Sequence, residues 1–232
     1  MIRTSSLLLA LVLTAPVWSS GVEPQGCADK KCLQRWFKAV RSHDLRAVDS
    51  LLLCGANVDV QDRDGNTALM LASYAEWRDH RIAERLLKAG ANVNATGRNG
   101  STALRYTIGI GGAGQDTVLF QLLLEYGADV NASCAECCDR GAFLYTCMWG
   151  TPGMVEAMLA KGAYANSVDC EGRNALMHAV EGRNMAVVER LLRSGADTST
   201  VDRRGGSVLE QAERLGDEAI LQLLRMHGQP DR

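Results

Sequence analysis

The sequence predicts an all-α fold, a solenoid of about six stacked helix pairs. A glycine-alanine dipeptide returns at intervals of about 33 to 37 residues, an apolar pair precedes each glycine, and a polar turn recurs between the dipeptides. A unit of this length holds two short helices and a turn. Because one such unit cannot bury its apolar face alone, we expect the units to stack.

The dipeptides mark helix ends. Glycine accepts the positive φ that ends an α-helix, and the apolar pair before it supplies the buried side of the last turn. The dipeptides are Gly55-Ala56, Gly90-Ala91, Gly127-Ala128, Gly162-Ala163 and Gly195-Ala196, with a last glycine at Gly228. The apolar pairs are Leu51-Leu52, Leu86-Leu87, Leu123-Leu124, Met158-Leu159, Leu191-Leu192 and Leu223-Leu224. We expect the second helix of each pair to end at these sites.

The recurring turn marks the start of the first helix of each pair. Residues 62–69 read Asp-Arg-Asp-Gly-Asn-Thr-Ala-Leu, and similar patterns return at 97–104, 169–176 and 202–209. An Asx-glycine turn of this kind leads into a helix whose N-cap is Thr, Ser or Asn. We therefore expect a capping hydroxyl or amide side chain at the start of each of these helices.

This pattern resembles the ankyrin-repeat family from about Leu33 to Gly228. The resemblance implies an all-α ankyrin-repeat solenoid with hairpin fingers between the helix pairs. The chain departs from the family at Thr67-Ala68-Leu69-Met70, where the family carries Thr-Pro-Leu-His. The third full repeat is the least regular, because residues 138–144 fit it only with a one-residue shift.

The repeat also predicts how the chain is organised. A signal peptide and a short segment precede one ankyrin-repeat domain at 29–228, and a tail follows it. The expected parts are the signal peptide 1–19, the N-terminal segment 20–28, a cap at about 29–61, repeats at about 62–96, 97–133, 134–168, 169–201 and 202–228, and the tail 229–232.

The first nineteen residues have the three-part pattern of a secretory signal peptide. Arg3 precedes an apolar run at 7–13, and Val17 and Ser19 stand at the −3 and −1 positions of an expected cleavage site. The run is shorter than the ~20 apolar residues of a membrane span. A lipid anchor on Cys27 is another alternative, but the residues before it lack the aliphatic side chain of such sites. We expect an exported, periplasmic or alternatively secreted protein with no membrane span after cleavage.

Eight cysteines in an exported chain are expected to be oxidised where their thiols can meet. Cys134, Cys137 and Cys138 lie at the expected hairpin tip before the third full repeat, and Cys170 lies at the next tip. Adjacent helix layers lie ~10 Å apart, so we expect a disulfide from Cys170 to one of these three. Zinc held by the cluster, and free or redox-active thiols, are the alternatives.

The remaining cysteines lie in the cap and in one repeat helix. The two cap helices bring Cys54 towards the start of the first, which predicts a disulfide from Cys54 to Cys27 or Cys32. A Cys27–Cys32 pair is the competing possibility. Cys147 stands where other repeats carry a small helix-packing residue, so we expect a buried, unreactive thiol.

The sequence predicts no catalytic, metal or nucleic-acid site. The four histidines lie in different repeats without a hydrolase motif, and His178 is expected to be a hydrogen-bonded structural residue. The glycine-rich stretch 109–114 lacks the lysine of a phosphate-binding loop and is interpreted as a loop insertion. A formal charge of −2 gives no basic excess for nucleic-acid binding. We expect no enzyme activity, no cofactor and no metal.

The ankyrin resemblance implies a binding module whose fingers and inner helices form a concave surface, and it fixes no chemistry. A signal peptide on such an array is similar to the periplasmic ankyrin proteins of Gram-negative bacteria. We expect a scaffold or inhibitor whose partner is another protein, an exported toxin or a periplasmic enzyme. The most specific version of this expectation is an immunity protein that neutralises a periplasmic toxin. The alternative is a redox or peroxide-stress-protective protein that uses, or is supported by, its cysteine cluster.

Two surfaces are candidates for partner binding. The fingers carry an arginine-rich series suited to carboxylates, and the helix-to-helix loops carry tryptophans that form a second edge. The candidate residues are Arg63, Asp64, Asn66, Arg98, Asn99, Arg140, Glu171, Arg173, Arg203, Arg204, Trp77 and Trp149.

Overall fold

The computed structural model describes residues 30–74, 79–98, 100–109, 116–132 and 140–227. Within them, the regular structure is helical apart from two isolated β-bridges. The helices are α1 (Lys30–Arg41), α2 (Leu45–Leu53), α3 (Ala68–Ser73), α4 (His80–Lys88), α5 (Ala103–Tyr106), α6 (Thr117–Glu125), α7 (Ala142–Trp149), α8 (Pro152–Ala160), α9 (Ala175–Glu181), α10 (Met185–Arg193), α11 (Val208–Leu215) and α12 (Glu218–His227). The predicted all-α solenoid is confirmed.

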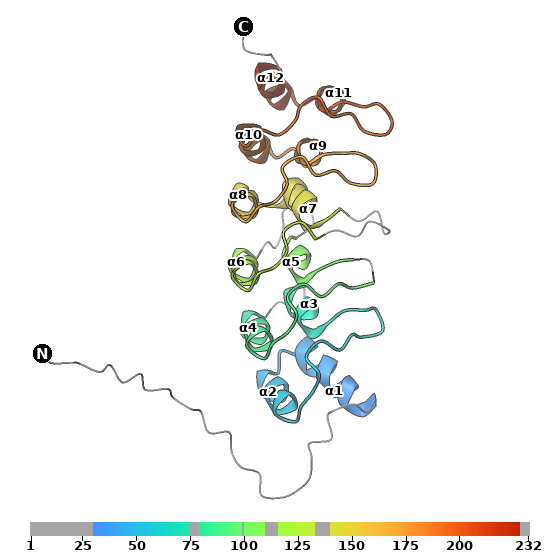
Figure 1. The fold of residues 1–232 in the computed structure, drawn as a ribbon, viewed down its shortest axis with the longest axis vertical. Helices are drawn as coiled ribbons and strands as arrows, with labels where there is room; N and C mark the ends of the chain where they lie inside the picture. The colour runs from blue at the N-terminus through green and yellow to red at the C-terminus, as the bar shows by residue number, and fades with distance from the viewer. Residues whose placement is uncertain (1–29, 75–78, 99, 110–115, 133–139, 228–232) are drawn as a thin grey trace, which may run out of the picture.

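The helices stack in pairs along one axis, from α1 and α2 at one end to α11 and α12 at the other (Figure 1). The odd-numbered helices, called inner helices here, form one column, and the even-numbered outer helices form another. The fingers project from the inner column. Each inner helix contacts the inner helices of the adjacent layers, so contacts between neighbouring layers hold the solenoid together.

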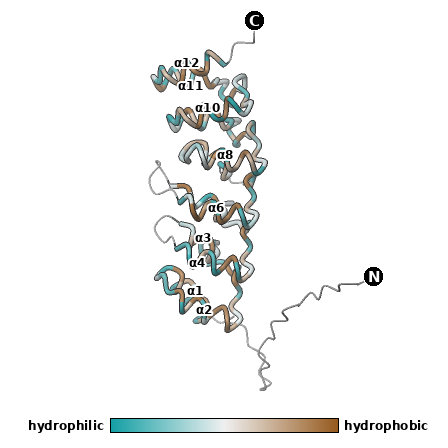
Figure 2. The backbone as a smooth tube through the Cα atoms, turned by 90° about the vertical axis from the view of Figure 1, so that its left-hand side faces the viewer, coloured by the Kyte–Doolittle hydropathy of each residue, from teal (hydrophilic) through white to brown (hydrophobic). Residues whose placement is uncertain are grey.

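A continuous apolar core runs through the stack between the two columns. The inner helix α3 is buried along its whole length. The outer helix α4 is amphipathic, with Ile82, Leu86 and Leu87 in the core and Glu84 and Lys88 in solvent. Figure 2 shows apolar segments recurring in layer after layer when the stack is turned by 90°. This pattern is the reason that single repeats need neighbours.

The predicted helix caps are present. The side chains of Thr67, Thr102, Asn174 and Ser207 each accept a hydrogen bond from the backbone N–H three residues further on. Such caps satisfy backbone donors that the first turn of a helix leaves unpaired. The exception is α7, whose N-cap residue Gly141 has no capping side chain. The third full repeat is therefore irregular at the position where its sequence departs from the others.

The fingers are built on the predicted Asx-glycine turns. Oδ1 of Asp62 accepts two backbone N–H groups, each at 2.9 Å, and Gly65 closes the turn with a φ of +81°. Asp169 and Asp202 accept the equivalent pairs. The first, second, fourth and fifth fingers span 61–66, 96–101, 168–173 and 201–206. The third finger, expected around 133–139, lies outside the described residues.

Asparagine side chains join successive layers at the hairpins. Nδ2 of Asn131 donates to the carbonyl oxygen of Gly162 at 3.0 Å, and its Oδ1 accepts from the backbone N–H of Tyr164 at 3.0 Å. Asn94 makes the same two bonds, at 3.1 and 2.7 Å, one layer earlier. Each asparagine therefore pairs both a donor and an acceptor of the next repeat, which fixes the spacing of the fingers.

Several expected segments lie outside the described residues. These are the signal peptide 1–19, the segment 20–28, the tail 229–232 and the glycine-rich stretch 109–114 beyond its first residue. In the part of the chain that the structure describes, no helix combines the length and apolar character needed to cross a membrane.

Candidate functional site

The finger tips carry a row of arginines. Arg63, Arg98 and Arg203 are exposed and occupy the same register in the first, second and fifth fingers. Cys170 takes this position in the fourth finger. The guanidinium groups of Arg63 and Arg203 make no hydrogen bond or ion pair with any described residue. Their charges are therefore available to a partner.

The arginine stems lie across the tips of the preceding fingers. A Cβ atom on Gly65 would stand 2.7 Å from Cγ of Arg98, so the absence of a side chain leaves room for that stem. In the fifth finger, the backbone N–H of Arg203 donates to the carbonyl oxygen of Glu171 at 2.8 Å. The tips thus support one another, which holds the arginines in fixed places.

The next position along each finger is mixed in charge. It carries Asp64, Glu171 and Arg204, all exposed, while Asn99 lies outside the described residues. We call the four exposed arginines at these two neighbouring positions of the fingers the finger row. Its members are Arg63, Arg98, Arg203 and Arg204. The row has an excess of positive charge suited to carboxylates.

Three of the predicted partner-binding residues face inward instead. The guanidinium of Arg173 is engaged by Asp169, Glu171 and Glu181 at 3.1, 3.2 and 2.9 Å, and its side chain is only 16% exposed. The Arg140 guanidinium lies 3.2 Å from the Met148 sulfur. These contacts were not visible in the sequence spacing, which gives a residue's register but not the direction of its side chain.

Asn66 is the third of these inward-facing residues. Its Oδ1 accepts a hydrogen bond from the hydroxyl of Tyr106 at 3.2 Å, across two layers. The side chain is therefore already used to brace the first finger against α5. Within the predicted series, the surface left to a partner is the finger row together with Asp64 and Glu171.

His178 is a buried, hydrogen-bonded structural residue, as predicted. Its Nε2 lies 3.0 Å from Oδ2 of Asp169, and its side chain is 0% exposed. Burial, assisted by the charges of Arg173 and Arg140, lowers the pKa of His178 from 6.5 to about 4. With the imidazole neutral, its Nε2–H donates to the Asp169 carboxylate. The histidine therefore joins the base of the fourth finger to α9.

The pKa of Asp169 is also displaced. Burial alone would raise it, but the backbone N–H groups of Arg173 and Glu171 and the charge of Arg173 lower the pKa of Asp169 below its usual value. Asp169 thus stays ionised beneath the fourth finger. The arrangement is a structural ion-pair network, because its members neutralise one another inside the protein.

The cap cysteine is not bonded as expected. Cys54 is an exposed, free cysteine at the C-terminal end of α2, so the predicted disulfide from Cys54 to Cys27 or Cys32 is not formed. The helix register turns this end of α2 outward, and the adjacent Leu53 is 88% exposed. Cys27 itself lies outside the described residues.

The other cysteines divide by environment. Cys147 is fully buried, and burial raises the pKa of its thiol, as expected of an unreactive packing residue. Cys170 is half-buried and lines a hollow of about 270 Å³ with Arg105, Arg140 and Tyr145. The cluster at 134–138, on which the zinc, redox and disulfide hypotheses depend, lies outside the described residues.

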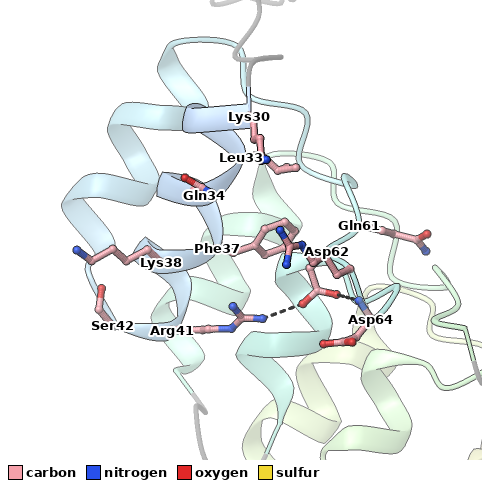
Figure 3. A pocket seen from close by; sticks show the side chains of 11 residues that line it. Lys30, Leu33, Gln34, Phe37, Lys38, Arg41, Ser42, Gln61, Asp62 and Asp64 are labelled. Atoms are coloured by element: carbon pink, nitrogen blue, oxygen red, sulfur yellow. Dashed lines mark hydrogen bonds and ion pairs between the residues drawn. The ribbon is translucent and has the colours of Figure 1, made fainter.

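A groove of about 790 Å³ lies between α1 and the first finger (Figure 3). The wall from α1 includes Lys30, Leu33, Phe37, Lys38 and Arg41, and the opposite wall is the finger segment 61–64. Nη2 of Arg41 crosses the groove to Oδ2 of Asp62 at 2.8 Å.

Sequence reasoning missed the α1 residues of this groove. The signal was present, because the helix reads Lys-Lys-Cys-Leu-Gln-Arg-Trp-Phe-Lys-Ala-Val-Arg, with five cations and no acid. The interpretation of the cap as a stabilising end piece hid this charge. The walls of the groove come from the cap and the first full repeat.

The second predicted surface, the loop edge, is partly described. Trp149 is half-buried and packs on the apolar core, whereas Trp77 lies outside the described residues. The rings of Tyr74 and Tyr106 meet edge to face, with centroids 5.5 Å apart. Within the described residues, no group of three or more His, Cys, Asp or Glu side chains is placed to hold a metal ion.

Comparison with known proteins agrees with this architecture. A family profile described as ankyrin repeats (3 copies) matches residues 36–134 and 143–231. A search of curated proteins finds no match. Among solved structures, an ankyrin repeat domain from Acinetobacter baumannii AYE is 26% identical, with a TM-score of 0.71 over 83% of this chain and 96% of that one.

Two further structures share the fold. The ankyrin repeat domain of Bcl-3, a member of the IkappaB family, is 25% identical, with a TM-score of 0.70 over 84% of this chain and 86% of that one. A chain from the complex of the Bdellovibrio bacteriovorus predatory endopeptidase Bd0816 with immunity protein Bd3460 is 22% identical, with a TM-score of 0.70 over 83% and 97%. With the family profile matched over most of its length, this chain belongs to the ankyrin-repeat family, whose members generally serve as protein-interaction scaffolds.

Proposed function

We propose that this chain is an exported protein-binding scaffold or inhibitor that acts through the finger row. In its sharpest form it is an immunity protein that neutralises a toxin in the periplasm. The observation that carries the proposal is the exposure of Arg63 and Arg203 on braced fingers, where neither guanidinium has a partner among the described residues. Arginines placed in this way suit the carboxylates of another protein.

Rigid placement favours binding. The turns are held by Asp62, Asp169 and Asp202, and the tips of the fourth and fifth fingers bond through their backbones. A partner that meets these arginines need not order the fingers first, so less conformational entropy is lost on association. Guanidinium groups in fixed positions can also bind carboxylates with two parallel hydrogen bonds, which adds geometric selectivity.

The export and inhibitor parts of the proposal have separate support. The apolar run at 7–13, with Arg3 before it, favours a signal peptide. An ankyrin fold also occurs in a structure of an endopeptidase bound to an immunity protein, although at 22% identity the likeness concerns the fold. Cell fractionation with an antibody against the chain tests export, and recovery from the cytosol alone would contradict it.

The test of binding is affinity capture from an envelope extract of the source cell, followed by mass spectrometry. We expect the parent protein to retain a partner that Arg98→Glu with Arg203→Glu loses, because reversed charges repel carboxylates. Arg46→Glu with Lys161→Glu is the matched control, since it reverses two exposed cations away from the fingers. Arg173→Glu is unsuitable, because it would break the internal network around Asp169.

The loop edge is tested with the same captured partner. Trp77→Ala with Trp149→Ala should leave binding unchanged if the finger row carries it. If this variant loses the partner while Arg98→Glu with Arg203→Glu keeps it, the interface lies on the loop edge. If all of these folded variants keep the partner, both surface assignments are wrong.

A further inference from the structure

We propose that the groove beside α1 binds an acidic, extended segment of the partner protein, with an apolar side chain of that segment seated over Leu33. The inference rests on the proposed protein-binding function and adds the chemistry of the partner and its place on the cap. It extends the binding surface from the finger tips to an inner helix that the repeat pattern did not single out.

The groove lies where α1, rather than another described finger, faces the first finger. At the cap end of the stack, α1 extends towards the finger side beneath the first finger (Figure 1). The first and second fingers meet directly, because the Gln61 side-chain amide donates to the carbonyl oxygen of Thr96 at 2.9 Å. Between α1 and the first finger, the Arg41–Asp62 ion pair spans the gap instead. A helix facing a finger leaves a wider hollow than two stacked fingers.

The exposed charge of the groove is positive. Lys30 and Lys38 from α1 and Arg63 from the finger are exposed and form no ion pair with a described residue. Asp62 does not offset them, because its Oδ2 is occupied by Arg41 and its Oδ1 by two backbone N–H groups. Asp64 is the remaining exposed acid. The groove therefore attracts anions although the whole chain has a formal charge of −2.

The floor of the groove is apolar. Leu33 is half-buried, and Phe37 beneath it is 5% exposed, with the guanidinium of Arg41 6.0 Å from its ring centroid. An apolar side chain that covers Leu33 would remove further apolar surface from water. A cationic rim around an apolar floor matches a segment in which acidic residues flank a leucine or phenylalanine.

The two cations in the first turn of α1 oppose local helix stability, whereas Lys38 and Arg41 stand in the last turn, where cations are favoured. Lys30 and Lys31 stand in the first turn of α1, where the positive end of the helix dipole disfavours positive charge, and no acid is present there. A cap that served stability alone would place acids at these positions. Lys30, which lines the groove, is therefore better explained by attraction to an anionic partner than by the stability of α1.

The first test uses a fluorescein-labelled octapeptide of alternating Glu and Asp with one Phe and one Leu, and measures fluorescence anisotropy at low salt. We expect the parent to bind it, and Lys30→Glu with Lys38→Glu to bind about ten-fold more weakly. Lys31→Glu with Arg35→Glu is the matched control. It reverses two exposed cations of the same helix that do not line the groove, and should stay within about two-fold of the parent.

Two further peptides separate charge from apolar contact. Replacing the acids with Lys should abolish binding, and replacing Phe and Leu with Gly should weaken it. The proposal is overturned if the parent binds the Lys peptide as tightly as the acidic one. Equal losses in the groove and control variants would also overturn it, because they would indicate a general attraction to α1. Circular dichroism spectra of the variants confirm that they fold.

The captured partner distinguishes the two proposals. If the finger variant loses the partner while the groove variant keeps it, the groove inference fails and the proposed function stands. If the parent captures no partner, the proposed function fails, whereas the peptide measurements still decide whether the groove prefers acidic segments. If both variants lose the partner and the α1 control keeps it, both proposals are supported.

Discussion

The imidazole Nε2 of His178 lies 3.0 Å from Oδ2 of Asp169, and the two side chains are 0% and 2% exposed. Nδ1 of the same ring is buried without a hydrogen-bond partner among the described residues. A second proton would therefore enter a site with little water and with the charges of Arg173 and Arg140 nearby. This explains why the pKa of His178 falls to about 4.

We predict that the free energy of unfolding decreases as the pH falls from 6.5 towards 4. In this window the unfolded chain binds a proton that folded His178 does not, so acid favours unfolding. The effect amounts to about 2 kcal/mol between pH 7 and pH 5. Urea unfolding at pH 7 and pH 5 should show a smaller difference in the free energy of unfolding for His178→Gln than for the parent, because glutamine does not titrate. An equal pH dependence in parent and variant would show that another group is responsible.

We predict that Gly182→Ala destabilises the stack by about 1 to 3 kcal/mol, because a Cβ there would stand 2.0 Å from the carbonyl oxygen of Met148. The φ of Gly182 is −73°, so backbone strain plays no part. Gly153→Ala is the control: a Cβ there, in the first turn of α8, would stand 3.9 Å from Oγ1 of Thr151, and helix propensity favours alanine. Thermal unfolding measures both, and equal melting temperatures would contradict the predicted clash.

We predict that Asn131→Ala lowers the free energy of unfolding by about 1 to 3 kcal/mol, because a donor and an acceptor of the next layer lose their partner. Asn131→Asp keeps the acceptor for Tyr164 but cannot donate to Gly162, so its stability should lie between those of the parent and the alanine variant. Asn57→Ala is the control, because the Asn57 side chain bonds within its own turn. A greater loss in the control would show that local turns, rather than contacts between layers, limit stability.

We predict that non-reducing peptide mapping of protein from the periplasm finds Cys54 as a thiol and Cys32 linked to Cys27. The free state of Cys54 and the disulfide-bonded state of Cys32 support this pairing. The same map tests the predicted link from Cys170 to Cys134, Cys137 or Cys138, since export permits oxidation. Free thiols at all four of these positions would rule out that link and favour the redox alternative.

The repeat period, the helix ends and the caps were predictable because each depends on neighbouring residues in the sequence. Thr67 and Asn174 cap their helices as the local pattern requires. The irregular α7 was also visible, since Gly141 stands where the other repeats carry a capping side chain. Sequence periodicity predicts the layers of a solenoid because each layer is built from the same local pattern of helices and turns.

The surface was less predictable, because it depends on contacts between residues that are distant in the sequence. Register placed Arg63 and Arg173 alike on fingers, but Glu181 and Asp169 draw Arg173 inward. The groove could not be predicted without knowing that α1 lies against the first finger, because no repeat in the sequence shows this contact. The predicted disulfide of Cys54 was wrong for a similar reason, because two helices that lie close together do not determine the direction of a thiol.

The asparagine bonds between layers bear on how the protein should be produced. Asn94-Ala95-Thr96 and Asn131-Ala132-Ser133 are acceptor sequences for N-linked glycans in a eukaryotic secretory pathway. A glycan attaches to the side-chain nitrogen that here donates to the following layer. Sugar on this nitrogen would leave it a single N–H and place a bulky group beside the following repeat, so it would weaken the bond between the two layers. A bacterial host, or substitutions of Thr96 and Ser133 that remove both acceptor sequences, avoids this conflict.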